Sequence, residues 1–133
     1  MTESQLPDDV QELVTRLFGY TRDGGGDAAH MLDLYLENGV DPDLSNQDGN
    51  SLLMIAAYSG NREALDVLIK HRADVNKLNG RNQSPLAGAI FKKEDEIIDR
   101  LITAGADPLL GTPNAVDTAR MFGREDLLIR FES

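Results

Sequence analysis

The feature that most constrains the fold is an internal repetition with a period of 33 residues. Residues 51–76 return as residues 84–109, and the two copies align without a gap. Self-similarity at a fixed period of this length is typical of proteins that stack one small supersecondary unit on the next. The sequence therefore predicts a solenoid. The nine identical pairs are Ser51/Ser84, Leu53/Leu86, Ala56/Ala89, Glu63/Glu96, Asp66/Asp99, Leu68/Leu101, Ile69/Ile102, Ala73/Ala106 and Asp74/Asp107.

Each copy of the repeat predicts two helices joined by a turn. Ser51 and Ser84 stand before short apolar runs. A serine at this place can cap a helix, because its side chain accepts a hydrogen bond from a free backbone N–H group. Gly60 then turns the chain into a second helix, whose buried side is predicted to contain Leu68 in the first copy and Leu101 in the second. The predicted fold class is therefore all-α.

The segments outside the two copies are predicted to form incomplete units. Apolar residues recur at helical spacing between residues 10 and 18. Asp27 is predicted to cap a second helix, which Gly39 ends. Residues 114–119 match the start of the repeat again, but only 30 residues after Ser84. We therefore expect one domain over residues 1–133, divided into an N-terminal cap helix with a degenerate repeat (7–39), two repeats (46–78 and 79–109) and a C-terminal cap repeat (110–133).

Gly39, Arg72 and Gly105 form a column with one residue per period, each at the predicted end of a second helix. A left-handed residue often closes a helix at this place, and glycine adopts that conformation freely. If Arg72 adopts the same conformation, we expect a cost of about 1 kcal/mol. Lys93 similarly replaces the turn glycine that Gly60 supplies in the preceding copy.

The repeated pattern resembles the ankyrin repeat, whose signature opens on T-P-L-H-x-A-A, continues through a V-x-x-L-L run and ends on G-A-D-x-N. Residues 84–86 match the opening and residues 105–107 match the ending. Met54, Ala87 and Asp117 depart from the pattern, because each stands in the usual histidine column. The resemblance implies a solenoid of helix-turn-helix units with short projecting turns, and a concave groove that binds other molecules without catalysis.

The small size of the chain and its TARMFG segment, residues 118–123, resemble short single-domain ankyrin repeat proteins of bacteria. Some of that group are encoded beside catalases and are thought to assist them. The resemblance therefore implies a protein-protein interaction module, with an accessory role toward a bacterial enzyme such as catalase as one expectation.

The groove residues that the resemblance implies belong to two sets. One set lies in the projecting turns: Gln47, Asp48 and Asn50 in one unit, and Arg81 and Gln83 in the next. The other set follows the alanine column at the end of each first helix: Tyr58 and Ser59, Phe91 and Lys92, Met121 and Phe122. Apolar and aromatic side chains at exposed positions are the usual anchors of protein interfaces. Packing against neighbouring repeats is the alternative role for Phe91, Met121 and Phe122.

The net charge of -10 is concentrated in one half of the chain. Residues 1–66 contain 13 acidic residues and three arginines, whereas residues 67–133 contain ten of each sign. An acidic half repels phosphate groups, so we expect neither nucleic acid nor an anionic membrane as partner. The acidic half either keeps the protein soluble or meets a basic protein surface. The predicted groove has charges of both signs, which suits a protein partner.

The sequence predicts no catalytic, metal or cofactor site. It contains no cysteine, which excludes disulfides and thiolate zinc sites. His30, with Asp27 and Asp33 nearby, is predicted to lie on a solvated helix face. His71 is predicted to act as a cation at a helix C-terminus. The acidic residues 94–96, with Asp99, are predicted to complement a helix dipole.

Two further functions stay open at this point. The chain could be an immunity or antitoxin-like inhibitor whose acidic half covers a basic toxin. It could also handle haem or another ligand, with Tyr58, His30 or His71 as an axial ligand. The amino terminus lacks the basic and apolar segments of a secretory signal, and no apolar run is long enough to span a membrane. We therefore expect a cytoplasmic monomer.

Overall fold

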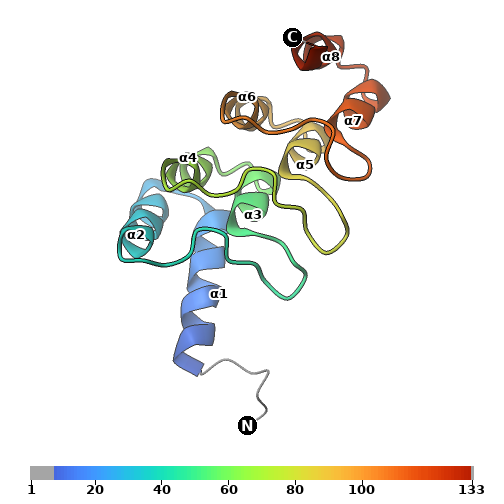
Figure 1. Ribbon diagram of the computed structural model, residues 1–133. Helices are drawn as coiled ribbons and strands as arrows, with labels where there is room; N and C mark the ends of the chain where they lie inside the picture. The colour runs from blue at the N-terminus through green and yellow to red at the C-terminus, as the bar shows by residue number, and fades with distance from the viewer. Residues whose placement is uncertain (1–7, 133) are drawn as a thin grey trace.

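The computed structural model describes residues 8–132 of the chain and is all-helical (Figure 1). The only β pairing within these residues is an isolated bridge between Ser45 and Ser51. The fold class predicted from the repeat is confirmed. The predicted start of the first unit at residue 7 lies outside the described residues. The helices are α1 (Asp8–Asp23), α2 (Gly26–Glu37), α3 (Leu52–Tyr58), α4 (Arg62–Lys70), α5 (Pro85–Phe91), α6 (Asp95–Thr103), α7 (Ala115–Met121) and α8 (Glu125–Glu132).

The helices form hairpins that stack side by side. Helix α1 pairs with α2, α3 with α4, α5 with α6, and α7 with α8. The first helices of the hairpins follow one another in an inner row, and the second helices follow in an outer row (Figure 1). Long loops join one hairpin to the next and project to one side of the stack (Figure 1). This is the architecture of a helical solenoid.

Three of the inner helices begin with a side-chain cap, and two of these caps were predicted from the sequence. Ser51 Oγ accepts a hydrogen bond from the Met54 N–H group at 3.0 Å, and Ser84 Oγ accepts one from Ala87 at 3.1 Å. Asn114 does the same for α7 through its Oδ1 atom. Each such cap satisfies a backbone donor that the helix cannot pair internally, and stabilises the helix by about 1 kcal/mol.

The cap predicted at Asp27 is wrong. Helix α2 begins at Gly26 after an N-cap at Gly25, and no side chain accepts a capping hydrogen bond there. Gly24 and Gly25 have φ values of 79° and 95°, a conformation that glycine reaches more easily than other residues. The glycine run therefore lets the chain reverse sharply after α1, and Asp27 falls in the first turn of α2, where its charge complements the helix dipole.

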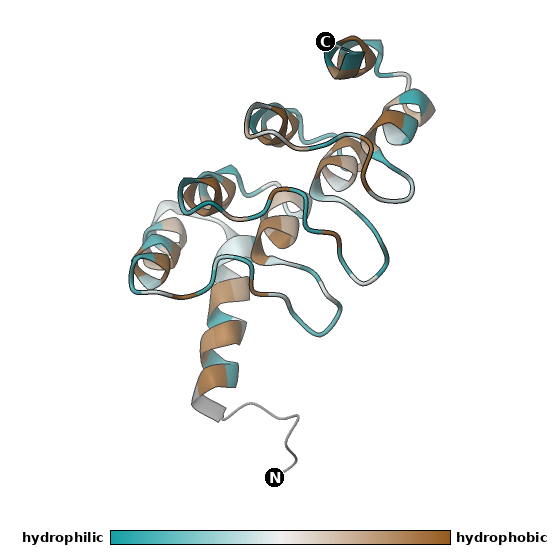
Figure 2. Ribbon diagram, in the orientation of Figure 1, coloured by the Kyte–Doolittle hydropathy of each residue, from teal (hydrophilic) through white to brown (hydrophobic). Residues whose placement is uncertain are grey.

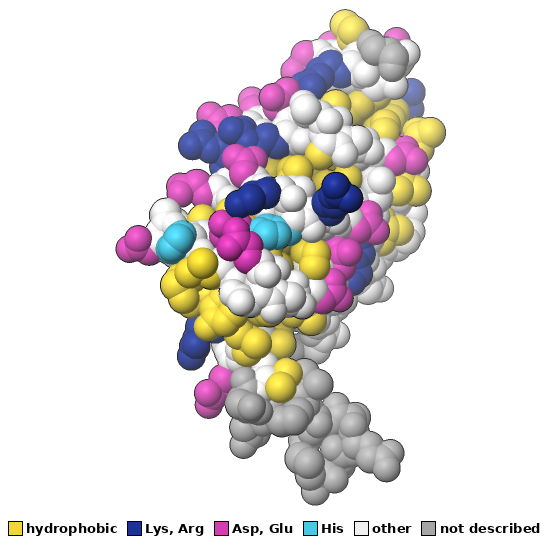
Figure 3. Space-filling model, turned by 60° about the vertical axis from the view of Figure 1, so that its left-hand side comes forward, with side chains coloured by type: hydrophobic (Ala, Val, Ile, Leu, Met, Phe, Trp, Pro, Cys, Tyr) yellow, Lys and Arg dark blue, Asp and Glu magenta, His cyan; other side chains and the backbone are white. Residues whose placement is uncertain are grey.

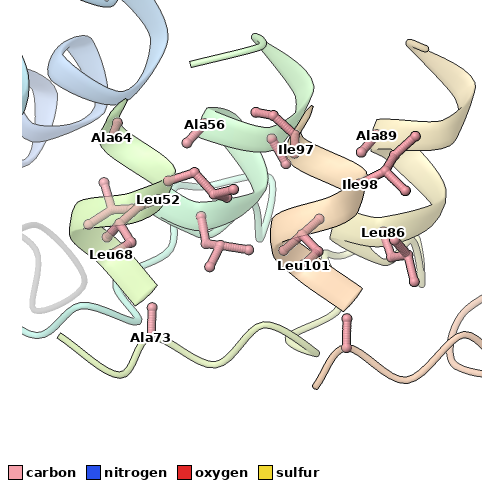
Figure 4. Packing of buried hydrophobic residues seen from close by; sticks show 14 of the residues in the cluster. Leu52, Ala56, Ala64, Leu68, Ala73, Leu86, Ala89, Ile97, Ile98 and Leu101 are labelled. Atoms are coloured by element: carbon pink, nitrogen blue, oxygen red, sulfur yellow. The ribbon is translucent and has the colours of Figure 1, made fainter. Parts of the chain in front are cut away.

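The core runs along the stack between the two rows of helices. Leu68 and Leu101 are fully buried at equivalent places in α4 and α6, as the period predicts (Figure 4). Ala56 and Ala89 are also fully buried and stand on the inner helices, where their small side chains let neighbouring helices approach closely (Figure 4). Apolar residues are concentrated in the helices, whereas the projecting loops are largely hydrophilic (Figure 2). A continuous core of this kind binds each hairpin to the next.

Arg72 adopts the left-handed conformation that glycine adopts elsewhere in its column. Its φ is 63°, against 99° at Gly39 and 93° at Gly105. Lys93, with a φ of 60°, occupies the equivalent left-handed place that Gly60 fills in the preceding hairpin. The backbone therefore has the same conformation at equivalent positions of the repeats, even where a residue other than glycine must adopt a conformation that costs about 1–2 kcal/mol.

The projecting loops are held by asparagine side chains one period apart. Asn46 Oδ1 accepts hydrogen bonds from the Asp48 and Asn50 N–H groups, both at 3.0 Å. Asn79 Oδ1 closes the next loop in the same way, at 3.0 Å from the Arg81 nitrogen. The loops are also tied to one another, because the Gly80 N–H group donates to the Asp48 carbonyl. These bonds fix the backbone of the loops beside the inner helices.

Candidate functional site

A groove of about 500 Å³ lies between the projecting loops and the inner helices α3, α5 and α7. It spans three hairpins, so its shape depends on the stack and not on one repeat. Loops and helices both contribute to its walls. The residues that line it are Asp48, Asn50, Met54, Ile55, Tyr58, Asn79, Arg81, Gln83, Ser84, Ala87, Gly88, Phe91, Pro113, Thr118 and Met121.

Three large apolar side chains form a column along this groove. Tyr58, Phe91 and Met121 are each the last residue of an inner helix, α3, α5 and α7 respectively. Their exposed fractions are 46%, 54% and 67%. The repeat brings them to equivalent places in successive hairpins, so the predicted column exists in three dimensions. Its exposure separates it from the core, where large side chains of α3 and α5 such as Leu53 and Leu86 are buried.

The loop wall of the groove is polar and ordered by its own hydrogen bonds. The Asn79 amide donates to Asn50 Oδ1 at 2.9 Å and to Gln83 Oε1 at 2.8 Å. Asp48 and Arg81 project from consecutive loops into the same groove. The wall therefore offers a carboxylate and a guanidinium beside amides that hydrogen bonds hold in place, and these groups can form directional contacts with a docked protein.

Seven of the predicted groove residues line the groove: Asp48, Asn50, Tyr58, Arg81, Gln83, Phe91 and Met121. Gln47, Ser59, Lys92 and Phe122 do not line it, although all four are exposed. Lys92 and Phe122 still contact the column. The Lys92 ammonium lies 5.1 Å from the centroid of the Tyr58 ring, and the Phe122 ring packs edge-on against Phe91 with centroids 5.8 Å apart.

Sequence reasoning missed eight of the lining residues: Met54, Ile55, Asn79, Ser84, Ala87, Gly88, Pro113 and Thr118. Asn79 had a detectable signal, because Asn46 precedes it by one period. Gly88 had another, because a glycine within a short helix is costly and often marks a close approach by a neighbouring group. The hydroxyl groups of Ser84 and Thr118 bond to the backbone at the starts of α5 and α7. They therefore serve the helix ends.

The outer helices present ion pairs that connect successive hairpins. Arg100 in α6 lies 2.8 Å from Asp66 in α4, and Arg130 in α8 lies 3.0 Å from Asp99 in α6. The acidic run at the start of α6 also pairs with neighbouring hairpins, through Arg62–Glu96 and Arg124–Asp95. Acidic and basic side chains accordingly alternate over this face (Figure 3). Exposed pairs of this kind contribute little individually.

A second cluster of titratable groups joins α2 to α4. Asp33 Oδ1 lies 2.6 Å from His71 Nε2 and 3.1 Å from Lys70 Nζ. The hydrogen bond from His71, followed by that from Lys70, lowers the pKa of the Asp33 carboxyl below its usual value. His30, by contrast, is exposed. Sequence spacing placed Asp33 beside His30. The fold instead pairs Asp33 with His71 at the end of the neighbouring outer helix α4.

Asp33, Glu37 and His71 bring three potential metal ligands within 4.8 Å of one another. Lys70 Nζ already lies 3.1 Å from Asp33 and 3.9 Å from Glu37, so its ammonium group occupies the place that a cation would take. The His71 ring is likewise bonded to Asp33. The cluster is therefore satisfied within the fold and serves as a connection between two hairpins.

Every helix within residues 8–132 is too short or too polar to span a membrane.

Comparison with known proteins identifies the family to which this chain is similar. Residues 21–111 match the sequence model for ankyrin repeats in three copies. The chain is 37% identical over 68 residues to an ankyrin repeat protein of Pseudomonas aeruginosa, which covers 49% of this chain and 38% of that protein.

Two further relatives are much longer proteins. The inactive serine/threonine-protein kinase TEX14 of Mus musculus is 32% identical over 95 residues, which cover 71% of this chain and 6% of that protein. The Caenorhabditis elegans homologue of the transient receptor potential cation channel subfamily A member 1 is 30% identical over 90 residues, or 66% of this chain and 7% of that protein. The chain thus spans well under half the length of each of these relatives.

The stacked helical hairpins, the projecting loops and the match of residues 21–111 all indicate the same family. Ankyrin repeats are in general non-catalytic units that bind protein partners on an extended concave surface. The family model covers more than half of the chain. The chain therefore belongs to the ankyrin repeat family.

Proposed function

We propose that this protein binds a partner protein in the groove, with Tyr58, Phe91 and Met121 as apolar anchors and the loop residues as polar contacts. The observation that carries the proposal is the column itself. Three large apolar side chains stay about half exposed or more at the ends of successive inner helices, whereas large core side chains such as Leu53 and Leu86 are at most 1% exposed. Anchors of this kind, within a rim that excludes water, provide most of the free energy of a typical protein interface.

The order of the groove supports the same function. The loops are bonded to one another and to their own turns, so little conformational entropy is lost when a partner docks. The site contains a carboxylate in Asp48 and a cation in Arg81, but no histidine is among its lining residues. A surface that is apolar at its floor and polar at its edge matches the usual anatomy of a protein interface.

The proposal is tested by affinity purification from the source organism with the purified chain as bait. The Tyr58→Ala and Phe91→Ala double variant should lose the captured proteins that the wild type retains. Leu109→Ala is the matched control, because Leu109 is an exposed apolar side chain, at 68%, outside the groove. Equal capture by the wild type and the groove variant would contradict the proposal.

The partner itself is open to a direct test. An accessory role toward a bacterial enzyme such as catalase is suggested by the resemblance to small bacterial ankyrin proteins, and the Pseudomonas aeruginosa relative supports a bacterial affiliation. Immobilised chain should then retain purified catalase, and the groove variant should not. An inhibitor of a basic toxin would instead use the acidic first half of the chain, and its binding should weaken strongly as salt is raised.

The geometry gives less support to haem handling. Tyr58 lies at the groove on α3, whereas His71 ends α4 and is bonded to Asp33 of α2. These two candidate axial ligands are therefore on different parts of the fold. Titration of the chain with haemin, followed by absorbance, would show a Soret shift if one of them coordinates iron.

A further inference from the structure

The lysine and arginine side chains of this protein differ in whether an oxygen atom pairs with them. Seven of its 13 lysine and arginine side chains lie in ion pairs with carboxylates within the described residues. Arg16 and Lys77 donate to uncharged oxygens, of Tyr35 and of the Asp43 backbone. The side chains of the remaining four, Arg72, Arg81, Lys92 and Lys93, find no carboxylate or other oxygen partner among residues 8–132.

One of those four cations lines the groove, and two lie beside it. Arg81 lines it from the loop before α5. Lys92 lies over the Tyr58 ring, and the Lys93 ammonium lies 6.0 Å from the centroid of the Phe122 ring. Both lysines are therefore held against aromatic faces by cation–π attraction. The groove and its surroundings thus combine an apolar column with positive charges that form no ion pair among residues 8–132.

This arrangement is unexpected in a chain with a net charge of -10. The chain has 23 acidic residues, and most cations away from the groove form ion pairs with carboxylates. Asp48 is the only acidic residue among those that line the groove. Three of the four cations without an oxygen partner among the described residues are therefore gathered at or beside the exposed apolar anchors.

We propose that the segment bound in this groove is acidic, with an apolar side chain seated on the Tyr58–Phe91–Met121 column and flanking carboxylates paired with Arg81 and Lys92. The inference rests on the proposed function and specifies the chemistry of the partner. Docking would exclude water from the apolar floor, which strengthens ion pairs at its edge. Complementary charge would also speed association and fix the direction of the bound segment.

The same cations could attract a phosphate backbone, but the observations favour a protein. Asp48 stands in the groove with Arg81, and the acidic charge of the whole chain repels a polyanion. A nucleic acid would carry a negative charge at every step, whereas a protein segment can place its carboxylates only where the cations are. Binding of nucleic acid is therefore an outcome that would overturn the proposal.

The experiment is selection from a phage-displayed library of random peptides against the full chain at low salt. Selected peptides should be enriched in aspartate and glutamate beside a large apolar residue. Their affinity, measured by fluorescence polarisation, should fall about tenfold for the Arg81→Gln and Lys92→Gln double variant. Arg72→Gln is the matched control, because Arg72 is an unpaired cation outside the groove, and it should leave the affinity unchanged.

The outcomes separate this inference from the proposed function. Peptides that need Tyr58 and Phe91 but are basic or uncharged, and are indifferent to the Arg81 and Lys92 changes, overturn the acidic partner and leave the groove function standing. A selection with no peptide that depends on Tyr58 and Phe91 overturns both. A labelled single-stranded oligonucleotide that binds with the same dependence on Arg81 and Lys92 overturns the choice of a protein partner.

Discussion

The ring of Tyr58 lies against Gly88 of the next inner helix. A Cβ atom placed on Gly88 would meet Tyr58 Cδ1 at 3.2 Å and Met54 Sδ at 4.0 Å. Gly88 lies in the middle of α5, where glycine costs up to 1 kcal/mol relative to alanine. The missing side chain lets the aromatic ring settle into the groove floor. The column of apolar anchors therefore depends on a glycine that weakens its own helix.

A double-mutant cycle measures this contact. Gly88→Ala alone should gain less than about 1 kcal/mol in the free energy of unfolding, because the added methyl group displaces the Tyr58 ring and offsets the gain in helix propensity. In the Tyr58→Ala background the same change should gain the full amount. Urea denaturation of the four proteins gives the coupling. Equal gains in the two backgrounds would mean that the ring does not rest on Gly88.

Exposure divides the large apolar residues into a core set and a groove set. Leu68→Ala or Leu101→Ala should each lower the free energy of unfolding by roughly 2–5 kcal/mol, because both side chains are fully buried between hairpins. Tyr58→Ala combined with Phe91→Ala should leave the helical circular dichroism and the melting temperature nearly intact, since both rings are about half exposed. If the groove pair unfolds the protein as severely as a leucine change, the column belongs to the core.

The features that recur with the period were predictable from the sequence. Ser51 and Ser84 cap their helices, and Leu68 and Leu101 are buried, because each pair occupies one place in a repeated unit. The strained backbone at Arg72 was predictable for the same reason, since glycine fills that place elsewhere. The structural role of a residue can therefore be inferred from the sequence when an equivalent residue stands one period away.

Features that arise once, or between hairpins, were not predictable. Gly25 replaces a side-chain cap because the glycine run lets the backbone turn without one, and no other repeat contains such a run. The contact between Asp33 and His71 joins residues 38 apart, across two outer helices whose relative rotation the pattern does not specify. The proximity of Tyr58 to Gly88 depends in the same way on how closely α3 and α5 approach.

Arg72 offers a test of backbone strain. Arg72→Gly should raise the free energy of unfolding by roughly 0.5–1 kcal/mol, because glycine adopts a φ of 63° without the clash that a Cβ atom creates. Arg72→Ala separates backbone from side chain, since it removes the guanidinium but keeps the Cβ atom, and it should give no such gain. The measurement is chemical denaturation at neutral pH. A glycine variant less stable than the alanine variant would show that the strain is not there.

The hydrogen bonds from His71 and Lys70 to Asp33 make one contribution to stability dependent on pH. The pKa of the Asp33 carboxyl is lowered from its ordinary value of 3.8, because both partners favour the ionised form. The folded state thus binds the Asp33 proton less tightly than the unfolded state does. The resulting stabilisation is fully present above pH 3.8 and is lost as the pH falls through the lower folded value.

Asp33→Asn should therefore lower the melting temperature at pH 7, and the difference from the wild type should shrink as the pH is brought below 3.8. Asp48→Asn is the matched control, because the Asp48 side chain forms no ion pair among the described residues, and its difference from the wild type should stay near zero throughout. Thermal unfolding followed by circular dichroism across this range measures both. An Asp33→Asn deficit that persists undiminished in acid would point to lost packing in place of the charged hydrogen bonds, and would remove the link between α2 and α4 from the forces that hold the stack together.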